Sequence, residues 1–275
     1  MPSPMSDHPI GVFDSGIGGL SVLKYIHACL PNEQLLYFAD SGYAPYGGKP
    51  ESEIVARSLA IAEFLMQRDA KALVVACNTA TAAAIKALRE RYPTLPVVGV
   101  EPGLKPAAAL TATGVVGVLA TQRTLTSEKF NLLREQISAT TNVRFLPQPC
   151  IGLADQIEKG ELQSAETAML VRKYVEPLIE QGADTLVLGC THYPFVRPLI
   201  EDIAAQLTSK PITIVDTGEP VARQLARLLT ERDLLRERGP GTIAGFTTGS
   251  ETALCNAFSR LLTLEPPVSA LTTSA

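Results

Sequence analysis

The sequence predicts an α/β fold of two similar domains, each a mostly parallel sheet flanked by helices. Strand-like apolar runs alternate with helical patterns along nearly all of the 275 residues, which is typical of βαβ units. A second observation is an internal repeat: residues 73–81 read LVVACNTAT and residues 186–194 read LVLGCTHYP. In both, a short apolar run ends in a cysteine, as expected of a buried parallel strand. The repeat indicates that the two halves are built alike.

The expected strands are short apolar runs bounded by polar or turn-forming residues. They are 10–13, 35–38, 72–76, 97–100, 115–120, 143–146, 185–189, 212–215 and 242–246. Helices between them are indicated by apolar residues three or four positions apart, as in Leu20, Leu23 and Ile26. The same spacing recurs within 59–66, 85–88 and 225–229. Residues 269–275 are expected to be a frayed tail.

The expected domain boundaries lie at two joints that contain proline. The first, near residues 99–106, also contains glycine, and the second is Lys-Pro at residues 210–211. We predict a first domain of residues 1–98 to which the chain returns at 212–275, and a second of residues 99–211. The return is expected because the first domain would otherwise have too few strands. Open parallel sheets bind ligands at the carboxyl ends of their strands. The active site is therefore expected in the cleft between the domains.

Composition excludes several classes of partner. Formal net charge is −4, and no run of Lys or Arg exceeds two residues, so a nucleic-acid partner is not expected. No apolar stretch of 18 residues is present, so neither is a membrane partner. Residues 1–9 lack the apolar core of a signal peptide. We therefore expect a cytoplasmic location.

The five cysteines do not form a disulfide or redox pattern. Their number is odd, their spacing is wide and there is no Cys-x-x-Cys, which argues against a disulfide framework, a zinc ribbon and a thioredoxin-type redox protein. Cys29 and Cys255 are expected to pack as small apolar side chains. Cys150 is also expected to be structural.

Cys77 and Cys190 differ from the other cysteines because hydrogen-bonding residues follow them directly. Asn78 and Thr79 follow the first, and Thr191 and His192 follow the second. Two thiols facing one carbon can act as base and acid in turn, which is what inversion of an amino-acid α-carbon requires. Helix N-termini and His192 are expected to activate them.

A metal site formed by Cys77, Cys190, His192 and Asp14 is the alternative use of these residues. Zinc sites with thiolate and imidazole ligands usually show closely spaced ligand pairs, which this sequence lacks. The sequence also lacks a lysine in a strand-end loop with a clear phosphate-binding segment, which a pyridoxal phosphate site would need. We therefore expect neither a metal nor another cofactor.

Two glycine-rich segments follow the first two strands. Residues 11–19, GVFDSGIGG, lack the third glycine of a dinucleotide fingerprint and the Gly-Lys of a Walker loop. They form either a tight turn or an anion site at a helix start. Asp14 is expected either to face the ligand or to cap the helix. Residues 40–49 form either a ligand loop, whose amides could hold a carboxylate, or a plain surface loop.

These motifs resemble the cofactor-independent glutamate racemases. The resemblance is carried, in order along the chain, by GVFDSGIGG (11–19), YFADSGYAPYG (37–47), ACNTAT (76–81), GVEP (99–102), GCTHYP (189–194) and VDTG (215–218). It implies two α/β domains closing on glutamate, and a role in supplying D-glutamate for peptidoglycan.

The resemblance also implies roles for individual residues. Cys77 would take the proton from D-glutamate and Cys190 from L-glutamate, with Asp14 and His192 assisting. Glu158 would support His192. The implied substrate contacts are Asp14, Ser15, Tyr46, Gly47, Asn78, Thr79, Thr121, Thr124, Thr191 and His192.

Other functions stay open at this point. An aspartate racemase, or another racemase with two cysteines, would differ in the pocket for the substrate side chain. A non-catalytic amino-acid-binding module would have no use for paired thiols. The expected partner is a small-molecule substrate, glutamate, and whether the chain forms a homodimer is left open.

Overall fold

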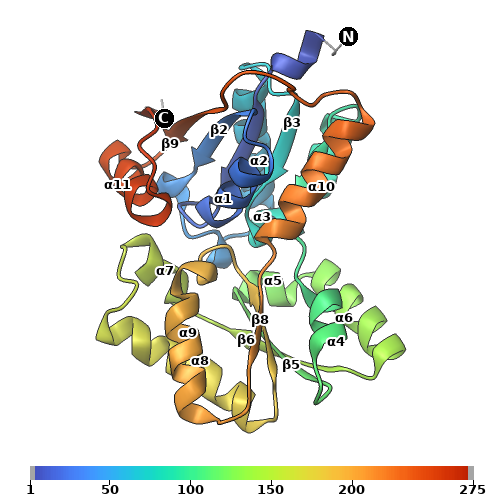
Figure 1. The fold of residues 1–275 in the computed structure, drawn as a ribbon, viewed down its shortest axis with the longest axis vertical. Helices are drawn as coiled ribbons and strands as arrows, with labels where there is room; N and C mark the ends of the chain where they lie inside the picture. Colours follow the sequence, from blue (N-terminus) through green and yellow to red (C-terminus); the bar gives the residue numbers. More distant parts are fainter. Residues whose placement is uncertain (1–3, 272–275) are drawn as a thin grey trace. The chain divides into compact units, whose positions relative to one another are not determined.

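A computed structural model describes residues 4–271, which form two compact units. Within this range unit 1 contains residues 4–100 and 218–271, and unit 2 is Glu101–Thr217. Figure 1 distinguishes the units by colour, because unit 1 is blue to cyan and orange to red whereas unit 2 is green to gold. No helix in the described range is both long and apolar enough to cross a membrane.

Unit 1 is built on a six-stranded sheet in the order β10-β9-β2-β1-β3-β4, with neighbouring strands parallel. Its strands are β1 (Ile10–Asp14), β2 (Gln34–Ala39), β3 (Ala72–Val75), β4 (Val97–Gly99), β9 (Thr242–Thr247) and β10 (Val268–Ala270). Its α-helices are α1 (Leu20–Cys29), α2 (Glu51–Met66), α3 (Asn78–Arg91), α10 (Gly218–Glu231) and α11 (Glu251–Leu262). Short 3-10 helices are η1 (Pro4–Asp7), η2 (Ser41–Tyr43) and η3 (Tyr46–Gly48).

Helices cover both faces of this sheet because its central strands are apolar on both faces. All five residues of β1 and all four of β3 are buried. α2 and α3 bury Leu65 and Leu88 against Phe13 and Val75 on one face. α1 packs against α10 and α11, and Figure 1 shows these three helices together. A buried sheet of this kind explains why its strands read as continuous apolar runs.

Unit 2 has a four-stranded sheet in the order β6-β5-β7-β8, again with parallel neighbours. Its strands are β5 (Val115–Ala120), β6 (Arg144–Pro149), β7 (Thr185–Gly189) and β8 (Thr213–Val215). Its helices are α4 (Leu104–Leu110), α5 (Gln122–Thr126), α6 (Glu128–Thr141), α7 (Leu153–Glu158), α8 (Ala165–Glu180), η4 (Tyr193–Val196) and α9 (Arg197–Leu207).

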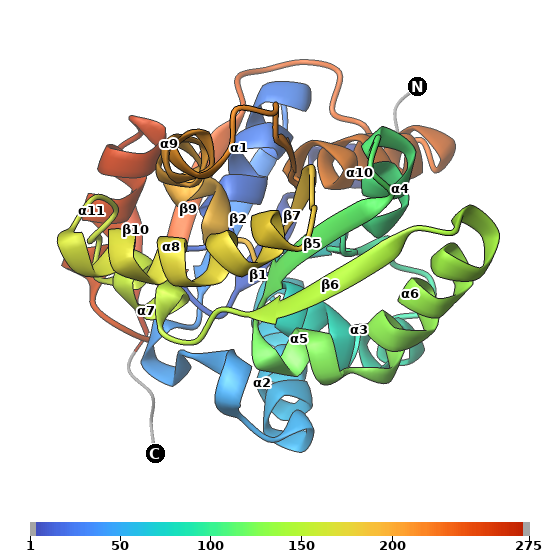
Figure 2. The same ribbon diagram turned by 90° about the horizontal axis from the view of Figure 1, so that it is seen from below.

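Alternate residues of β5 and β7 contribute to two separate cores. Val116 and Val118 pack with Phe130 of α6, whereas Leu119 packs with Leu178 of α8. Figure 2 shows β6, β5 and β7 side by side in this sheet. Unit 2 is therefore a second doubly covered parallel sheet, as the sequence predicts.

Three expectations differ from the structure. The strand expected at 212–215 pairs with β7 in unit 2, and the chain reaches unit 1 again at Gly218. β6 extends through two prolines to Pro149, which is tolerated because β6 is an edge strand and needs fewer backbone donors. Ser269 and Ala270, in the expected tail, belong to β10 and pair with β9; residues 272–275 of that tail lie outside the described range.

Asp184, just before β7, anchors the turn that leads into β5. Its carboxylate accepts hydrogen bonds from the Thr111 hydroxyl at 2.5 Å, from the amides of Ala112 and Thr113 at 2.7 and 2.8 Å, and from the Thr185 hydroxyl at 3.1 Å. Burial by itself would raise the pKa of Asp184, but these donors outweigh it and lower the pKa below its ordinary value.

Asp184→Asn is expected to lower the free energy of unfolding by about 1–2 kcal/mol at pH 7. Because the pKa of this carboxyl is lowered in the folded state, its contribution is present above the ordinary pKa of 3.8 and disappears as pH falls below it. Urea denaturation of the parent and the variant at pH 7 and pH 3 measures this. A difference that stayed constant between the two pH values would contradict the assignment.

Candidate active site

In both units the predicted site residues follow the carboxyl ends of neighbouring strands. β1 lies between β2 and β3 in unit 1, and β5 lies between β6 and β7 in unit 2. These are the points at which the strand order reverses, where open parallel sheets bind ligands. Asp14 ends β1 and Cys77 follows β3, while Thr121 follows β5 and Cys190 follows β7.

Asp14 holds the glycine-rich turn between β1 and α1. Its side chain is fully buried and accepts hydrogen bonds from the amides of Ser15 and Gly19 and from the Ser15 hydroxyl. A side chain at Gly19 would lie 2.7 Å from the Cβ of Asp14, so this position requires glycine. Asp14 therefore stabilises the turn that leads into α1, and its contact with a ligand stays a prediction.

Cys77 begins α3 as its N-cap residue. The Sγ atom accepts a hydrogen bond from the amide of Ala80 at 3.4 Å and lies 3.8 Å from the Ser15 hydroxyl. The positive end of the α3 dipole favours a negative charge on this sulfur. Because Ser15 also contacts Asp14, the three side chains form a path from thiol to hydroxyl to carboxylate.

Asn78 and Thr79 form the first turn of α3 and are both buried. Neither the amide nitrogen nor the amide oxygen of the Asn78 side chain finds a hydrogen-bond partner among the described residues. An unpaired buried amide is costly. The side chain of Asn78 is therefore positioned to bind a polar ligand beside Cys77.

Tyr46 and Gly47 lie in η3, which packs against α3. Tyr46 is buried in the same cluster as Cys77, and its hydroxyl donates to Asp40 at 2.5 Å. Burial, together with the charge of Asp40, raises the pKa of Tyr46. The phenol is therefore protonated at neutral pH and acts as a donor.

Cys190, His192 and Glu158 form a second path in unit 2. His192 Nδ1 lies 3.6 Å from Cys190 Sγ, and its Nε2 lies 2.6 Å from Glu158 Oε1. Burial lowers the pKa of His192, but the hydrogen bonds and charges of Cys190 and Glu158 outweigh burial and raise it well above 6.5. Both neighbours thus favour the protonated form of the buried imidazole.

Three threonines complete the predicted set in unit 2. Thr121 caps α5 and its hydroxyl lies 3.0 Å from that of Thr124. Thr191 is buried between Cys190 and His192. Since Ala120 is in register with Gly189, Thr121 and Cys190 emerge from adjacent strands at the same edge of the sheet.

The other three cysteines are free thiols with different surroundings. Cys150 is buried, and burial raises its pKa, consistent with a structural role. Cys255 is partly exposed on α11. Cys29 is exposed at the end of α1, so the expectation that it packs as a small apolar residue is wrong: helical spacing indicates the helix but not which side of it faces solvent near the end.

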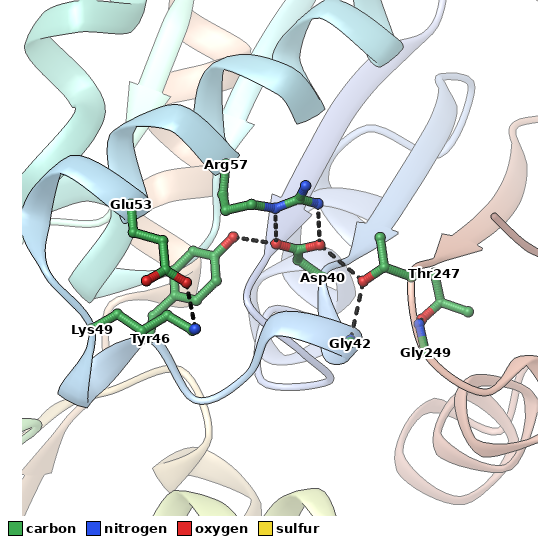
Figure 3. A network of polar contacts seen from close by, with 9 residues as sticks. Asp40, Gly42, Tyr46, Lys49, Glu53, Arg57, Thr247 and Gly249 are labelled. Atoms are coloured by element: carbon green, nitrogen blue, oxygen red, sulfur yellow. Dashed lines mark hydrogen bonds and ion pairs between the residues drawn. The ribbon is translucent and has the colours of Figure 1, made fainter. Parts of the chain in front are cut away.

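Sequence reasoning missed Asp40 and Arg57 (Figure 3) as members of the unit 1 network, and it also missed Thr248, whose hydroxyl donates to Asp40. Asp40 follows β2 at the same sheet edge as Asp14, and this position is a signal that could have identified it. Arg57 lies within α2 and Thr248 follows β9, and no local pattern marks either residue. Within residues 4–271, no group of three or more His, Cys, Asp or Glu is arranged to hold a metal ion.

Residues 10–225 match the family of Asp/Glu/Hydantoin racemases. The chain belongs to this racemase family. A relative named glutamate racemase, from Ectopseudomonas mendocina (strain ymp), is 56% identical over 84% of this chain and 85% of its own length.

Two solved structures are similar over nearly the whole chain. Glutamate racemase from Bacillus anthracis is 32% identical with a TM-score of 0.86, covering 98% of both chains. Glutamate racemase from Francisella tularensis subsp. tularensis, solved with D-glutamate, is 29% identical with a TM-score of 0.83, covering 98% of this chain and 99% of the other. The two-unit α/β architecture of this chain is thus that of known members of the racemase family.

Proposed function

We propose that this protein interconverts L- and D-glutamate without a cofactor, and that Cys77 and Cys190 are its two acid–base groups. The observation that carries the proposal is the equivalent setting of the two thiols. Each follows a central strand of its sheet, and each is connected to a carboxylate, Cys77 through Ser15 to Asp14 and Cys190 through His192 to Glu158. Family membership and the relatives named glutamate racemase support glutamate as substrate.

In the proposed reaction one thiolate removes the α-proton and the other thiol returns a proton on the opposite face. With D-glutamate, Cys77 as thiolate takes the proton and becomes the thiol, leaving a carbanion at Cα. The Cys190 thiol then protonates that carbanion to give L-glutamate and is left as the thiolate. The reverse reaction exchanges the two roles.

The neighbouring groups favour the charged forms that this reaction needs. The α3 N-terminus favours a thiolate at Cys77, and a protonated His192 beside Cys190 favours a thiolate there. The proposed substrate contacts of unit 1 are Asp14, Ser15, Tyr46, Gly47, Asn78 and Thr79. Those of unit 2 are Thr121, Thr124, Thr191 and His192. The hydroxyl, amide and backbone N–H donors among these contacts are neutral, and with the His192 ring they can bind the carboxylates of glutamate without an arginine or lysine.

Deuterium exchange at Cα tests this function. Dialysed, chelator-treated protein in D₂O is expected to incorporate deuterium into both L- and D-glutamate and to racemise both at an undiminished rate. The same assay with L- and D-aspartate in place of glutamate distinguishes an aspartate racemase, which would exchange and racemise aspartate. No exchange with any amino acid would indicate a binding module, and activity that required added zinc or pyridoxal phosphate would refute cofactor independence.

The D-glutamate formed would serve peptidoglycan synthesis. This use follows from the resemblance to glutamate racemases.

A further inference from the structure

The carboxylate of Asp40 is the centre of a buried network at the end of β2. Its side chain is 0% exposed, and side chains from three segments donate to it (Figure 3). The Tyr46 hydroxyl lies at 2.5 Å, Arg57 Nε and Nη2 at 3.0 and 2.7 Å, and the Thr248 hydroxyl at 2.9 Å. The negative charge is therefore fully hydrogen-bonded.

Arg57 is the cation that makes this buried charge tolerable. A carboxylate removed from water needs a partner of opposite charge, and the two parallel bonds from Arg57 are the strong bidentate form of that pairing. The guanidinium carbon also lies 3.7 Å from the centroid of the Tyr43 ring. Arg57, from α2, therefore contacts the loop at Tyr43 directly and at Tyr46 through Asp40.

The loop between these points, residues 41–48, contains the proposed glutamate contacts Tyr46 and Gly47. Two of its backbone amides are bonded at this network: Tyr43 donates to the carbonyl of Asp40 and Gly42 donates to the Thr248 hydroxyl. The side chains around Asp40 thus connect this loop to β2, to α2 and to the residue that follows β9. Because η3 packs on α3, the same loop shapes the surroundings of Cys77.

We propose that Arg57 is a positioning residue, which holds residues 41–48 through Asp40 and Tyr43 in the conformation that binds glutamate. The ligand in this statement rests on the proposed function, whereas the positioning rests on the contacts within unit 1. Arg57 itself donates to Asp40 and stacks on Tyr43, so it acts on substrate only through these residues.

Replacement of Arg57 is expected to affect binding more than chemistry. Arg57→Gln should raise KM for both glutamate enantiomers on the order of tenfold and change kcat by less than about twofold, because a loop that binds the ground and transition states alike contributes uniform binding. Arg57→Lys keeps the charge but not the fork of donors, so its KM should lie between those of Arg57→Gln and the parent.

Hydrogen–deuterium exchange of the amides in residues 41–48 tests positioning without reference to activity. These amides should exchange on the order of tenfold faster in Arg57→Gln, and the effect should be confined to this loop. Arg68→Gln is the matched control, since Arg68 also stacks on an aromatic ring, Phe64 at 3.6 Å, and donates to the Phe64 carbonyl. It should leave KM and the exchange of residues 41–48 unchanged.

The outcomes separate this inference from the function it rests on. If the parent racemises glutamate and Arg57→Gln shows parental KM and parental exchange in residues 41–48, the positioning role is wrong. If Arg57→Gln does not fold, Arg57→Lys is used in its place. The positioning role is equally wrong if hydrogen–deuterium exchange in Arg57→Lys rises evenly through unit 1 rather than in residues 41–48. If the parent does not racemise glutamate, the proposed function fails, and the exchange of residues 41–48 still decides the role of Arg57.

Discussion

Cys77→Ser and Cys190→Ser are each expected to lower racemisation of both enantiomers by about 10³-fold or more. Inversion needs a base on one face of Cα and an acid on the other, so losing either sulfur stops the complete reaction. A serine hydroxyl is far less acidic than a thiol, and its base form is scarcely present at neutral pH. Polarimetry in both directions measures the loss.

Loss of structure does not explain the expected result for Cys77→Ser. Cys77 is the N-cap residue of α3, and its sulfur accepts the amide of Ala80. Serine is among the preferred N-cap residues, so the helix should begin as before. Thermal unfolding of the variant is expected to resemble that of the parent.

A reaction that needs only one proton abstraction should survive and reveal which thiol serves which face. With a glutamate that carries a leaving group at Cβ, Cys77→Ser should retain elimination from the L-substrate and Cys190→Ser from the D-substrate. Cys29→Ser and Cys255→Ser are matched controls, because these thiols are exposed or partly exposed, and both should racemise normally. Parental racemisation in either Cys77→Ser or Cys190→Ser would exclude the two-base mechanism.

Glu158→Gln is expected to lower kcat/KM for L-glutamate by about 10- to 100-fold. The carboxylate lies 2.6 Å from His192 Nε2 and is one of two groups that raise the pKa of that buried imidazole, the other being Cys190. Without its charge, burial lowers the pKa of His192, so the ring loses its proton at a lower pH. The electrostatic stabilisation that the protonated His192 ring gives to a thiolate at Cys190 is then lost at a lower pH than in the parent.

The pH dependence tests this mechanism directly. The chain has three histidines, so the ring protons of His192 can be followed by NMR and assigned with His192→Gln. The midpoint of the His192 titration should move to lower pH in Glu158→Gln, and the alkaline limb of kcat/KM for L-glutamate should move in the same direction. Glu161→Gln, a nearby exposed glutamate, is the control. An unmoved His192 titration would show that Glu158 does not act on the ring.

Much of the fold could be predicted because its signals are local. The runs 115–120 and 185–189 match β5 and β7, and every other predicted strand overlaps an observed one within a few residues. The observed strand boundaries differ from the predicted ones where a strand's place in the sheet, rather than its local composition, sets where it ends. The extension of β6 to Pro149 depends on its edge position in the sheet, and β10 is a three-residue strand recognised only by its pairing with β9.

Local patterns were enough to place polar residues and thiols after the carboxyl ends of buried parallel strands, because each apolar run and the polar residues that end it are neighbours in the chain. Asp14, Cys77 and Cys190 could be selected on that basis. Which side chains meet depends on the tertiary structure, although the resemblance to glutamate racemases already implied the pairing of Glu158 with His192. Arg57 reaches Asp40 because α2 packs on the sheet that contains β2, and His192 meets Glu158 from 34 positions away. Such pairs depend on how whole elements pack, since a buried charge takes whichever partner the surrounding helices and loops bring within hydrogen-bond distance.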